Sequence, residues 1–276
     1  MLLAAMLATA EGRAASALPT PRVLSLSLCI DTVLVELAPR EQIVALSHYA
    51  REPERSTIVE LAHTFPVTYE TAEEVVTLRP DLVLASRHSA FATRNALRRV
   101  GIPFELFNEP DSIAESIDQI RRIAKLIGRV AAGEALIARI ERAVTAARLP
   151  AGRAPLSAAI YQPGGLTAGP DTLPGELMRT VGLINIAERY DIKRWRPLPL
   201  ELLVASPPNV LLVGEVSPGA PTASEQVIQH RALRALDSQM NREPFAARLL
   251  YCAGPVMIDA LRALVSAREN AVKAGL

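Results

Sequence analysis

The chain has 276 residues, of which 50% are apolar and 21% are charged, and its formal net charge is +1. This length and composition are typical of a globular chain with one large or two moderate domains. A charge balance this close to neutral argues against a polyanion-binding surface, so nucleic acid is not an expected partner.

The N-terminus has most of the pattern of a secretory signal peptide. Residues 1–10 form an apolar run, and Ala15-Ser-Ala17 places small residues where a signal peptidase cleaves. The basic start of such a peptide is missing, and ten apolar residues are too few to span a bilayer. The alternative is an apolar terminus with an incidental A-x-A. Cys29 follows Leu28 rather than a small residue, so we expect secretion through residues 1–17 without a lipid anchor.

The next segment, residues 20–127, alternates short apolar runs with helical patterns. We expect strands at residues 23–28, 43–46, 82–85 and 103–107, and helices at residues 31–37, 72–78 and 91–100. Thr71 and Glu74 have the spacing of a capping box, and Gly101 is placed to end the last helix. Strands that alternate with helices predict a parallel sheet covered on both faces.

A helical stretch then separates two α/β regions. Residues 111–149 carry apolar side chains at helical spacing, and residues 130–149 predict one helix about 30 Å long. We assign residues 128–149 to a connecting helix and residues 152–276 to a second α/β lobe. In that lobe we expect strands at residues 156–161, 210–213 and 248–251, and helices at residues 173–181, 199–205, 225–236 and 257–270.

One pattern occurs once in each α/β region. Glu73 and Glu201 each stand seven residues before a Pro, at Pro80 and Pro208, and an Asp or Asn and an apolar run follow. Each copy predicts a short helix that leads into a buried strand. The repeat therefore indicates two similar lobes, an arrangement in which a ligand usually binds between them.

The order and spacing of these features resemble a class III periplasmic substrate-binding protein of ABC importers. The resemblance rests on the repeated Glu and Pro unit, the opening Arg22-Val-Leu-Ser-Leu-Ser-Leu-Cys-Ile-Asp31 and the single long helix. Residues 161–169, Tyr-Gln-Pro-Gly-Gly-Leu-Thr-Ala-Gly, and residues 252–255, Cys-Ala-Gly-Pro, resemble one branch of that group. The match covers essentially all of the chain after Ala17.

The resemblance implies a fold, a class of ligand and a partner. Two similar lobes with parallel sheets flanked by helices would be joined by one long α-helix, with the ligand cleft between them. The ligand would be an iron–siderophore complex, haem or a cobalamin-type corrinoid, and the partner an ABC permease in the inner membrane. The protein would be periplasmic and monomeric, and it would need no cofactor. Glu73 and Glu201 match the acidic residues that dock each lobe on the permease.

Ligand-facing residues are expected where the strands of each sheet end, because open parallel sheets bind ligands beyond their carboxyl edges. Arg and aromatic side chains near such edges suit a flat or anionic chelate. A solvated loop in which Trp195 covers its own lobe is the alternative for residues 189–196. The candidates are His48, Tyr49, Arg87, Tyr161, Gln162, Gly164, Gly165, Arg194, Trp195 and Arg196.

A second hypothesis is that a side chain of the protein coordinates the metal of the ligand directly. His48 or Tyr161 could act as an axial ligand to haem iron or cobalt. A lone His beside a strand end is more often hydrogen-bonded in the core or at the surface. The other His residues lack metal-ligand spacing, so a zinc or manganese receptor is not expected. Cys29 and Cys252 could pair in an oxidising compartment, but sequence alone gives no distance between them, so two free thiols are the default expectation.

Two rival functions remain open. A metal chelatase or cofactor-biosynthesis enzyme on a similar two-lobed fold would need an acid–base pair in the cleft, and Asp31 with His48 is the only pairing available. The glycines at positions 164, 165 and 169 match neither the dinucleotide nor the phosphate-loop pattern. A ligand sensor that works without a transporter is the third possibility.

Overall fold

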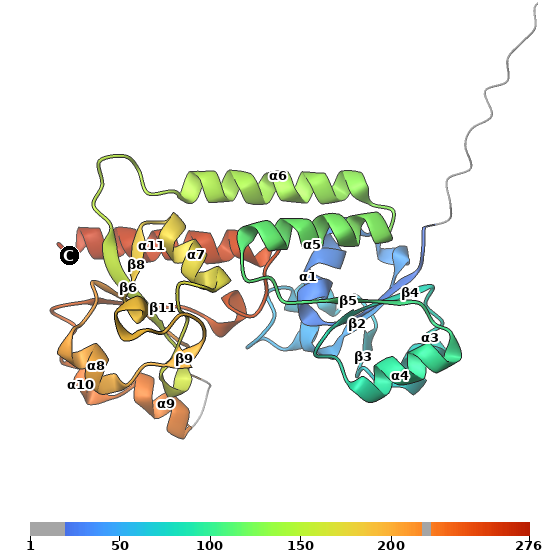
Figure 1. Ribbon diagram of the computed structural model, residues 1–276, viewed down its shortest axis with the longest axis horizontal. Helices are drawn as coiled ribbons and strands as arrows, with labels where there is room; N and C mark the ends of the chain where they lie inside the picture. The colour runs from blue at the N-terminus through green and yellow to red at the C-terminus, as the bar shows by residue number, and fades with distance from the viewer. Residues whose placement is uncertain (1–19, 217–221) are drawn as a thin grey trace, which may run out of the picture.

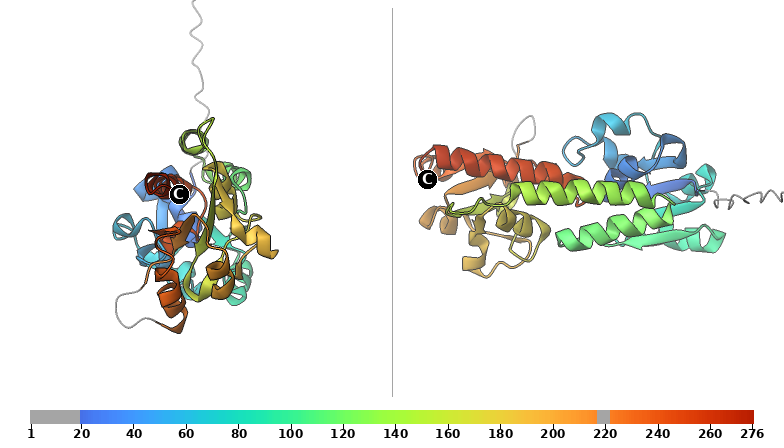
Figure 2. Two further views of the ribbon diagram at one scale, coloured as in Figure 1. Left: turned by 90° about the vertical axis from the view of Figure 1, so that its left-hand side faces the viewer. Right: turned by 90° about the horizontal axis from the view of Figure 1, so that it is seen from above.

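The computed structural model describes residues 20–216 and 222–276, and the predicted signal peptide lies outside them. The chain forms two α/β lobes side by side, with a layer of long helices along one side of both (Figure 1). Figure 2 shows the same layer from above, with α6 crossing from one lobe to the other. The predicted fold class, two similar lobes joined by one long helix, is confirmed.

The first lobe contains a five-stranded parallel sheet. Its strand order is β3-β2-β1-β4-β5, so β1 lies at the centre. The strands are β1 (Val23–Leu26), β2 (Ile43–Ser47), β3 (Val67–Thr68), β4 (Leu82–Ser86) and β5 (Phe104–Phe107). The helices are α1 (Leu28–Leu37), α2 (Val59–Ala62), α3 (Ala72–Leu78), α4 (Phe91–Val100) and α5 (Ile113–Leu126), with 3-10 turns at Arg40–Gln42 and His48–Arg51.

The second lobe repeats this plan with four parallel strands in the order β11-β10-β6-β8. The strands are β6 (Leu156–Tyr161), β8 (Leu183–Asn185), β10 (Val210–Val213) and β11 (Asn241–Pro244), and β7 (Leu166–Thr167) pairs antiparallel with β9 (Arg196–Pro197). The helices are α7 (Leu173–Thr180), α8 (Leu200–Ala205), α9 (Ala223–Ile228), α10 (Arg231–Arg234) and α11 (Val256–Lys273), with 3-10 turns at Pro163–Gly165, Ile186–Tyr190 and Ala247–Leu249.

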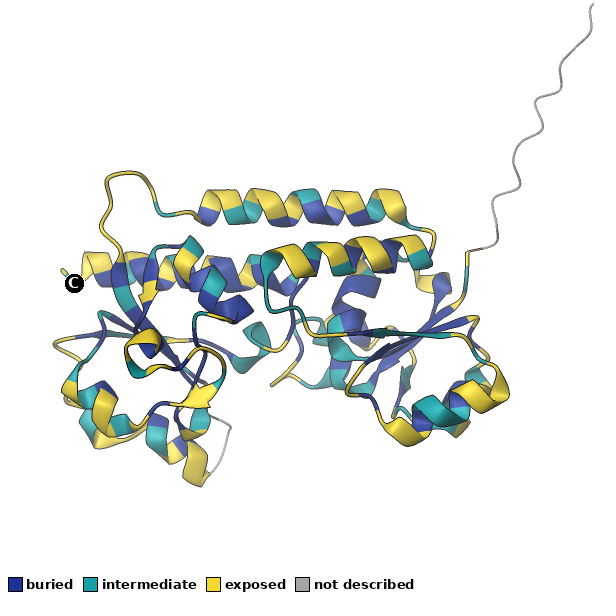
Figure 3. Cartoon of the chain, in the orientation of Figure 1, coloured by how far each residue is buried: buried dark blue, intermediate teal, exposed yellow. Residues whose placement is uncertain are grey.

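A single hydrophobic core runs beneath the helical layer of both lobes. It includes Leu136 and Ile140 of α6 (Val130–Ala147) together with Leu264 of α11 and residues from both sheets. Two smaller clusters cover the opposite faces of the sheets, one in each lobe. Figure 3 shows that buried residues concentrate in the strands and on the inner faces of the helices. Each sheet is thus covered on both faces, as the alternating pattern predicts.

Several predicted elements differ from the structure. The strand expected at residues 248–251 is wrong, because a 3-10 turn occupies Ala247–Leu249 and the fourth strand is β11. The helix expected at residues 225–236 is interrupted, since the His230 side chain accepts a hydrogen bond from the Ala232 N–H and starts α10. Helix α1 begins at Leu28 rather than residue 31, so β1 is only four residues long.

The capping box expected before α3 is only half formed. The Thr71 side chain accepts a hydrogen bond from the Glu74 N–H. The Glu74 carboxylate, however, accepts from the Thr68 hydroxyl and the Tyr69 N–H, at 2.7 and 2.8 Å. Glu74 therefore ties the end of β3 to α3 instead of returning to the Thr71 N–H. None of the described helices combines the length and apolar character needed to cross a bilayer.

Candidate ligand-binding site between the lobes

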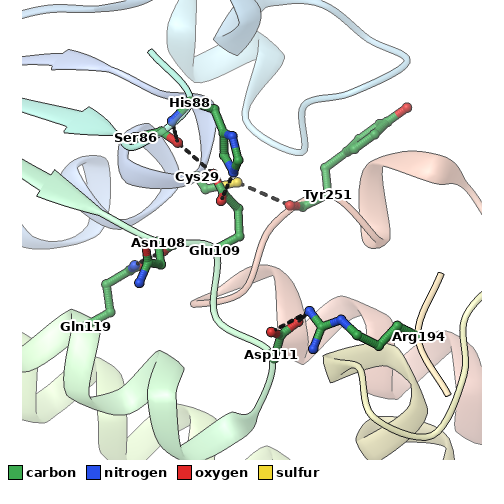
Figure 4. A network of polar contacts seen from close by, with 9 residues as sticks. All are labelled: Cys29, Ser86, His88, Asn108, Glu109, Asp111, Gln119, Arg194 and Tyr251. Carbon is green, nitrogen blue, oxygen red and sulfur yellow. Dashed lines mark hydrogen bonds and ion pairs between the residues drawn. The ribbon is translucent and has the colours of Figure 1, made fainter. Parts of the chain in front are cut away.

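A pocket of about 500 Å³ lies between the two lobes, and residues from both line it. The first lobe contributes Cys29 from the start of α1 and Glu109, Pro110 and Asp111 from the segment between β5 and α5. The second lobe contributes Gln162, Pro163, Leu166, Leu173, Pro174, Trp195, Ala247, Leu250, Tyr251, Cys252 and Ala253. Figure 4 shows part of the polar surroundings of this pocket. Its walls are mainly apolar, as is usual for sites that bind small molecules.

Cys29 and Cys252 form a disulfide at this pocket, so the expectation of two free thiols is wrong. Their Cα atoms lie 4.9 Å apart, within the range that a disulfide spans. Cys29 reaches this position because α1 starts two residues after β1 ends. Cys252 lies in the loop that leads into α11. The disulfide therefore links the two lobes covalently at the edge of the pocket.

Polar contacts reinforce this connection on the side of α5. Asp111 accepts two hydrogen bonds from Arg194 of the second lobe, at 2.8 and 2.7 Å (Figure 4). The pair raises the pKa of the Arg194 guanidinium, through the hydrogen bond first and the charge attraction second. Glu176 of α7 accepts from the Ile113 N–H at 2.8 Å. These contacts order the two walls of the pocket relative to one another.

Glu109 forms an acidic part of the first-lobe wall. One carboxylate oxygen accepts a hydrogen bond from the Ser86 hydroxyl at 2.7 Å, and the other lies 3.1 Å from Nε2 of His88. Ser86 is the last residue of β4, and its hydroxyl also accepts from the His88 N–H. The carboxyl ends of β4 and β5 thus position Glu109 from two directions, as Figure 4 shows.

Two of the predicted ligand-facing residues line this pocket, Gln162 and Trp195. The pocket does not include the other eight. Arg87 and Arg196 are exposed, and Arg194 is held by Asp111 beside the pocket. Gly164 and Gly165 form the tight turn after β6, where both have φ above +70°. Only glycine adopts that backbone conformation without strain, so these two residues shape the turn.

Tyr161, predicted to face the ligand, lies in the core of the second lobe. Its side chain is fully buried in the core cluster on the outer face of the second sheet, beneath Gly165. Burial, with the nearby Glu201 carboxylate, raises the pKa of Tyr161 to about 12. Its hydroxyl has no hydrogen-bond partner among the described residues. The Tyr161 side chain therefore does not line the pocket.

His48 and Tyr49 lie in a second group on the first lobe, outside the pocket. The His48 ring stacks on Tyr69 with centroids 4.9 Å apart and lies 3.9 Å from Tyr49. Arg55 lies over the Tyr49 ring at 5.2 Å. Nδ1 of His48 is buried without a hydrogen-bond partner among the described residues. This aromatic group follows the carboxyl ends of β2 and β3.

Asp31, the carboxyl group of the acid–base pair considered for an enzyme, is not accessible to solvent. Asp31 is fully buried, and both the Ser47 N–H and the Ser47 hydroxyl donate hydrogen bonds to it. Burial raises the pKa of Asp31 to about 8, although the hydrogen bonds from serine act in the opposite direction. Among the described residues, no group of three or more His, Cys, Asp or Glu side chains is placed to hold a metal ion.

Several residues near the carboxyl ends of strands or in the cleft were not among the predicted ligand-facing residues. Glu109 and Asp111 follow the end of β5 and were missed, although the strand ending at residue 107 was predicted. Tyr69 follows β3, a strand of two residues that gives almost no periodic signal. Tyr251 was expected to lie in a strand, but it follows the 3-10 turn at Ala247–Leu249. Of these residues, only Glu109 and Asp111 could have been predicted from the sequence, because they follow a strand that was itself predicted.

Glu73 and Glu201 lie on opposite lobes in equivalent positions. Each is exposed in the first turn of a short helix, α3 in the first lobe and α8 in the second. Figure 1 places both helices on the side of the sheets away from α6. Neither carboxylate has a hydrogen bond or ion pair to another described residue. Both therefore remain available to a partner outside the chain.

A pocket between two similar α/β lobes is the architecture of a ligand-binding protein. The sequence profile of the family described as "Periplasmic binding protein" matches residues 23–242. The chain belongs to this family.

Comparisons with individual proteins agree with this assignment. A cobalamin-binding protein from Halobacterium salinarum strain R1 is 28% identical over 197 residues, which cover 70% of this chain. The match spans about half of that relative, 53% of its length. Among solved structures, the haem-binding protein RhuT from Roseiflexus sp. RS-1 matches with a TM-score of 0.70 and 22% identity, over 93% of this chain and all of RhuT. The vitamin B12-binding protein BtuF of Vibrio cholerae matches with a TM-score of 0.66 and 18% identity, over 92% of this chain and 99% of BtuF. The structural matches establish the fold.

Proposed function

We propose that the protein captures a metal chelate of the tetrapyrrole type, with a corrinoid as the first choice, and delivers it unchanged to an ABC permease. The observation that carries this proposal is the pocket of about 500 Å³ that residues of both lobes line. Its volume falls within the range of about 300–1,000 Å³ that is typical of small-molecule sites. A ligand held there contacts both lobes at once, which favours capture and release through small changes in their separation.

The chemistry of the walls supports a ligand that arrives already chelated. The pocket offers aliphatic side chains with Trp195 and Tyr251, which suit the face of a macrocycle. The described residues contain no cluster of metal ligands, and Tyr161 is buried away from the pocket. Recognition would then depend mainly on apolar contact and hydrogen bonds to the chelate. The cobalamin-binding relative supports a corrinoid over haem or a ferric siderophore.

Delivery to a permease is supported by the two exposed carboxylates. Glu73 and Glu201 are presented from matching helices on different lobes and are free to pair with cations of a partner. Charged groups at the rim of an interface mainly steer and orient the encounter. A permease with two basic sites would therefore engage both lobes together. Delivery of this kind places the protein in the periplasm, reached through the predicted signal peptide at residues 1–17.

The test is a titration of the purified protein with cobalamin, haem and ferric siderophores. Trp195 is the only Trp in the chain and lines the pocket, so its fluorescence reports on binding there directly. Saturable quenching by cobalamin, with calorimetry giving a Kd below about 10 μM, or about 7 kcal/mol of binding free energy, is expected. Trp195→Phe provides the optical control. Binding of haem or a siderophore alone would replace the corrinoid, and failure of all three ligands would reject the proposal.

A further inference from the structure

The polar part of the pocket has an uneven charge distribution. The charged side chains among the described residues that line it are Glu109 and Asp111, both acidic, and no Lys or Arg is among them. The guanidinium of Arg194, beside the pocket, is already held by both oxygens of Asp111. A ligand carboxylate could pair with Arg194 only by displacing Asp111. Among the described residues that line it, the pocket therefore offers no unpaired Lys or Arg to an anionic ligand.

The two carboxylates are not equivalent. Asp111 is neutralised by a guanidinium that carries a full positive charge and occupies both of its oxygens. Glu109 is held instead by the Ser86 hydroxyl and the His88 imidazole, with one contact to each oxygen. An ionised carboxylate can accept about four hydrogen bonds, so Glu109 keeps unused capacity. Because Ser86 is buried and fixed in β4, that capacity is held in a defined place at the first-lobe wall.

The opposite wall of the pocket carries a neutral amide. Gln162 lines the pocket from the second lobe and is only 5% exposed. Its Nε2 donates to the carbonyl of Phe245 at 3.1 Å, and this contact fixes the orientation of the amide. Its Oε1 is buried and has no donor among the described residues. This oxygen lies against Gly214 and has almost no accessible surface, so the Gln162 amide offers the pocket neither a charge nor a free acceptor. Glu109 is therefore the group with unused acceptor capacity on which the argument rests.

We propose that this pocket selects ligands whose periphery carries amide N–H groups and discriminates against ligands that carry carboxylates, with Glu109 as the residue that determines this specificity. The inference rests on the proposed function and narrows its ligand class. Amide side chains are characteristic of complete corrinoids, whereas haem and many ferric chelates present carboxylates. An amide N–H gains a charge-assisted hydrogen bond from Glu109, while a carboxylate meets a like charge.

Two corrinoids with the same ring and cobalt provide the test. Dicyanocobinamide carries amide side chains, and dicyanocobyrinic acid carries free carboxylates at the same positions. The protein is expected to bind the amide form at least about tenfold more tightly. Glu109→Gln keeps the shape and removes the charge, so it should shrink this preference by about three- to tenfold, the difference between a charged and a neutral acceptor. Glu134→Gln makes the same chemical change on α6 away from the pocket and should leave the preference unaltered.

Ionic strength supplies a measurement that needs no variant. Raising salt from about 0.05 to about 0.5 M screens the repulsion, so affinity for cobyrinic acid should rise while affinity for cobinamide changes little. Equal affinity of the unmodified protein for both corrinoids would overturn the inference, and so would a preference that Glu109→Gln leaves intact in folded protein. If neither corrinoid binds, the corrinoid assignment itself fails, and that result is distinct from binding without discrimination.

Discussion

Cys29 and Cys252 join the two lobes of this protein through a disulfide although 223 residues separate them in the chain. One half is in the first turn of α1 and the other in the loop before α11, and both line the interlobe pocket. The lobes are therefore connected at this edge as well as through α6. Such a connection limits how far the pocket can open while leaving its other side free to adjust.

Reduction of the disulfide is expected to destabilise the protein by about 2–5 kcal/mol, because the open chain regains the conformational freedom of a very long loop. Urea unfolding with and without a dithiol reductant measures this difference. The double variant Cys29→Ser with Cys252→Ser should match the reduced protein and show no response to the reductant. An unchanged unfolding midpoint on complete reduction, verified by thiol titration, would contradict the expectation.

The buried carboxyl of Asp31 makes stability depend on pH. Burial raises its folded pKa to about 8, whereas an unfolded Asp titrates near 3.9. The unfolded state therefore releases a proton that the folded state retains between these values. The contribution of Asp31 to stability is greatest below about pH 4 and should fall by up to about 1.4 kcal/mol per pH unit until the pH passes the folded value of about 8.

Asp31→Asn isolates this contribution. The amide still accepts from the Ser47 N–H but does not titrate, so the slope of stability against pH should become much shallower between about pH 5 and pH 8. The variant should gain most over the unmodified protein at the alkaline end. Glu70, whose pKa burial also raises, accounts for a residual slope in the same direction. Urea midpoints across this range test the claim, and parallel curves for the two proteins would disprove it.

Most of the fold could be predicted because its signals are local. Alternating apolar runs located β2, β4, β6 and β10, and the helices at residues 72–78 and 91–100 agree with the structure to the residue. Gly101 does adopt the positive φ that ends α4. The secondary structure of the second lobe was harder to predict where tertiary contacts override the local sequence pattern. Residues 241–244 form a strand with little apolar character because they pair with β10.

The site was harder to predict than the fold because it depends on distances between segments far apart in the chain. Position at the end of a strand predicted Gln162, and the cations around the single Trp predicted Trp195. Neither signal could tell which face of β6 Tyr161 occupies. The disulfide required a spacing that only the packed lobes define. Likewise, Arg194 is a plausible anion ligand in isolation, and its pairing with Asp111 removes it from that role.

Gly169 is expected to be essential for placing the segment that carries Arg194 and Trp195. A Cβ at this position would overlap the carbonyl of Ile192 and the backbone of Lys193. Gly169→Ala should therefore cost about 2–4 kcal/mol of stability, with weaker ligand binding in the fraction that folds. Gly152→Ala is the control, since its Cβ meets nothing within 4 Å and only the positive φ is strained. Thermal unfolding measures the loss of stability in both variants. Equal losses would show that the close contact between Gly169 and the backbone of Ile192 and Lys193 is not the cause.

Charge reversal at Glu73 and Glu201 separates delivery from capture. Both carboxylates are exposed, and neither lines the interlobe pocket, so Glu73→Lys with Glu201→Lys should leave the Kd for the ligand unchanged. Transport by the cognate permease in proteoliposomes should fall at least about tenfold, because the Lys on each lobe would repel the basic site proposed on the permease. Each single reversal should give a partial loss, since one lobe would still dock. Glu134→Lys on α6 makes the same charge change as either single reversal, so it is the control for the single variants and should transport normally. A weaker Kd for the ligand in the double variant would place these carboxylates at the binding site, and unchanged transport would remove them from the docking surface.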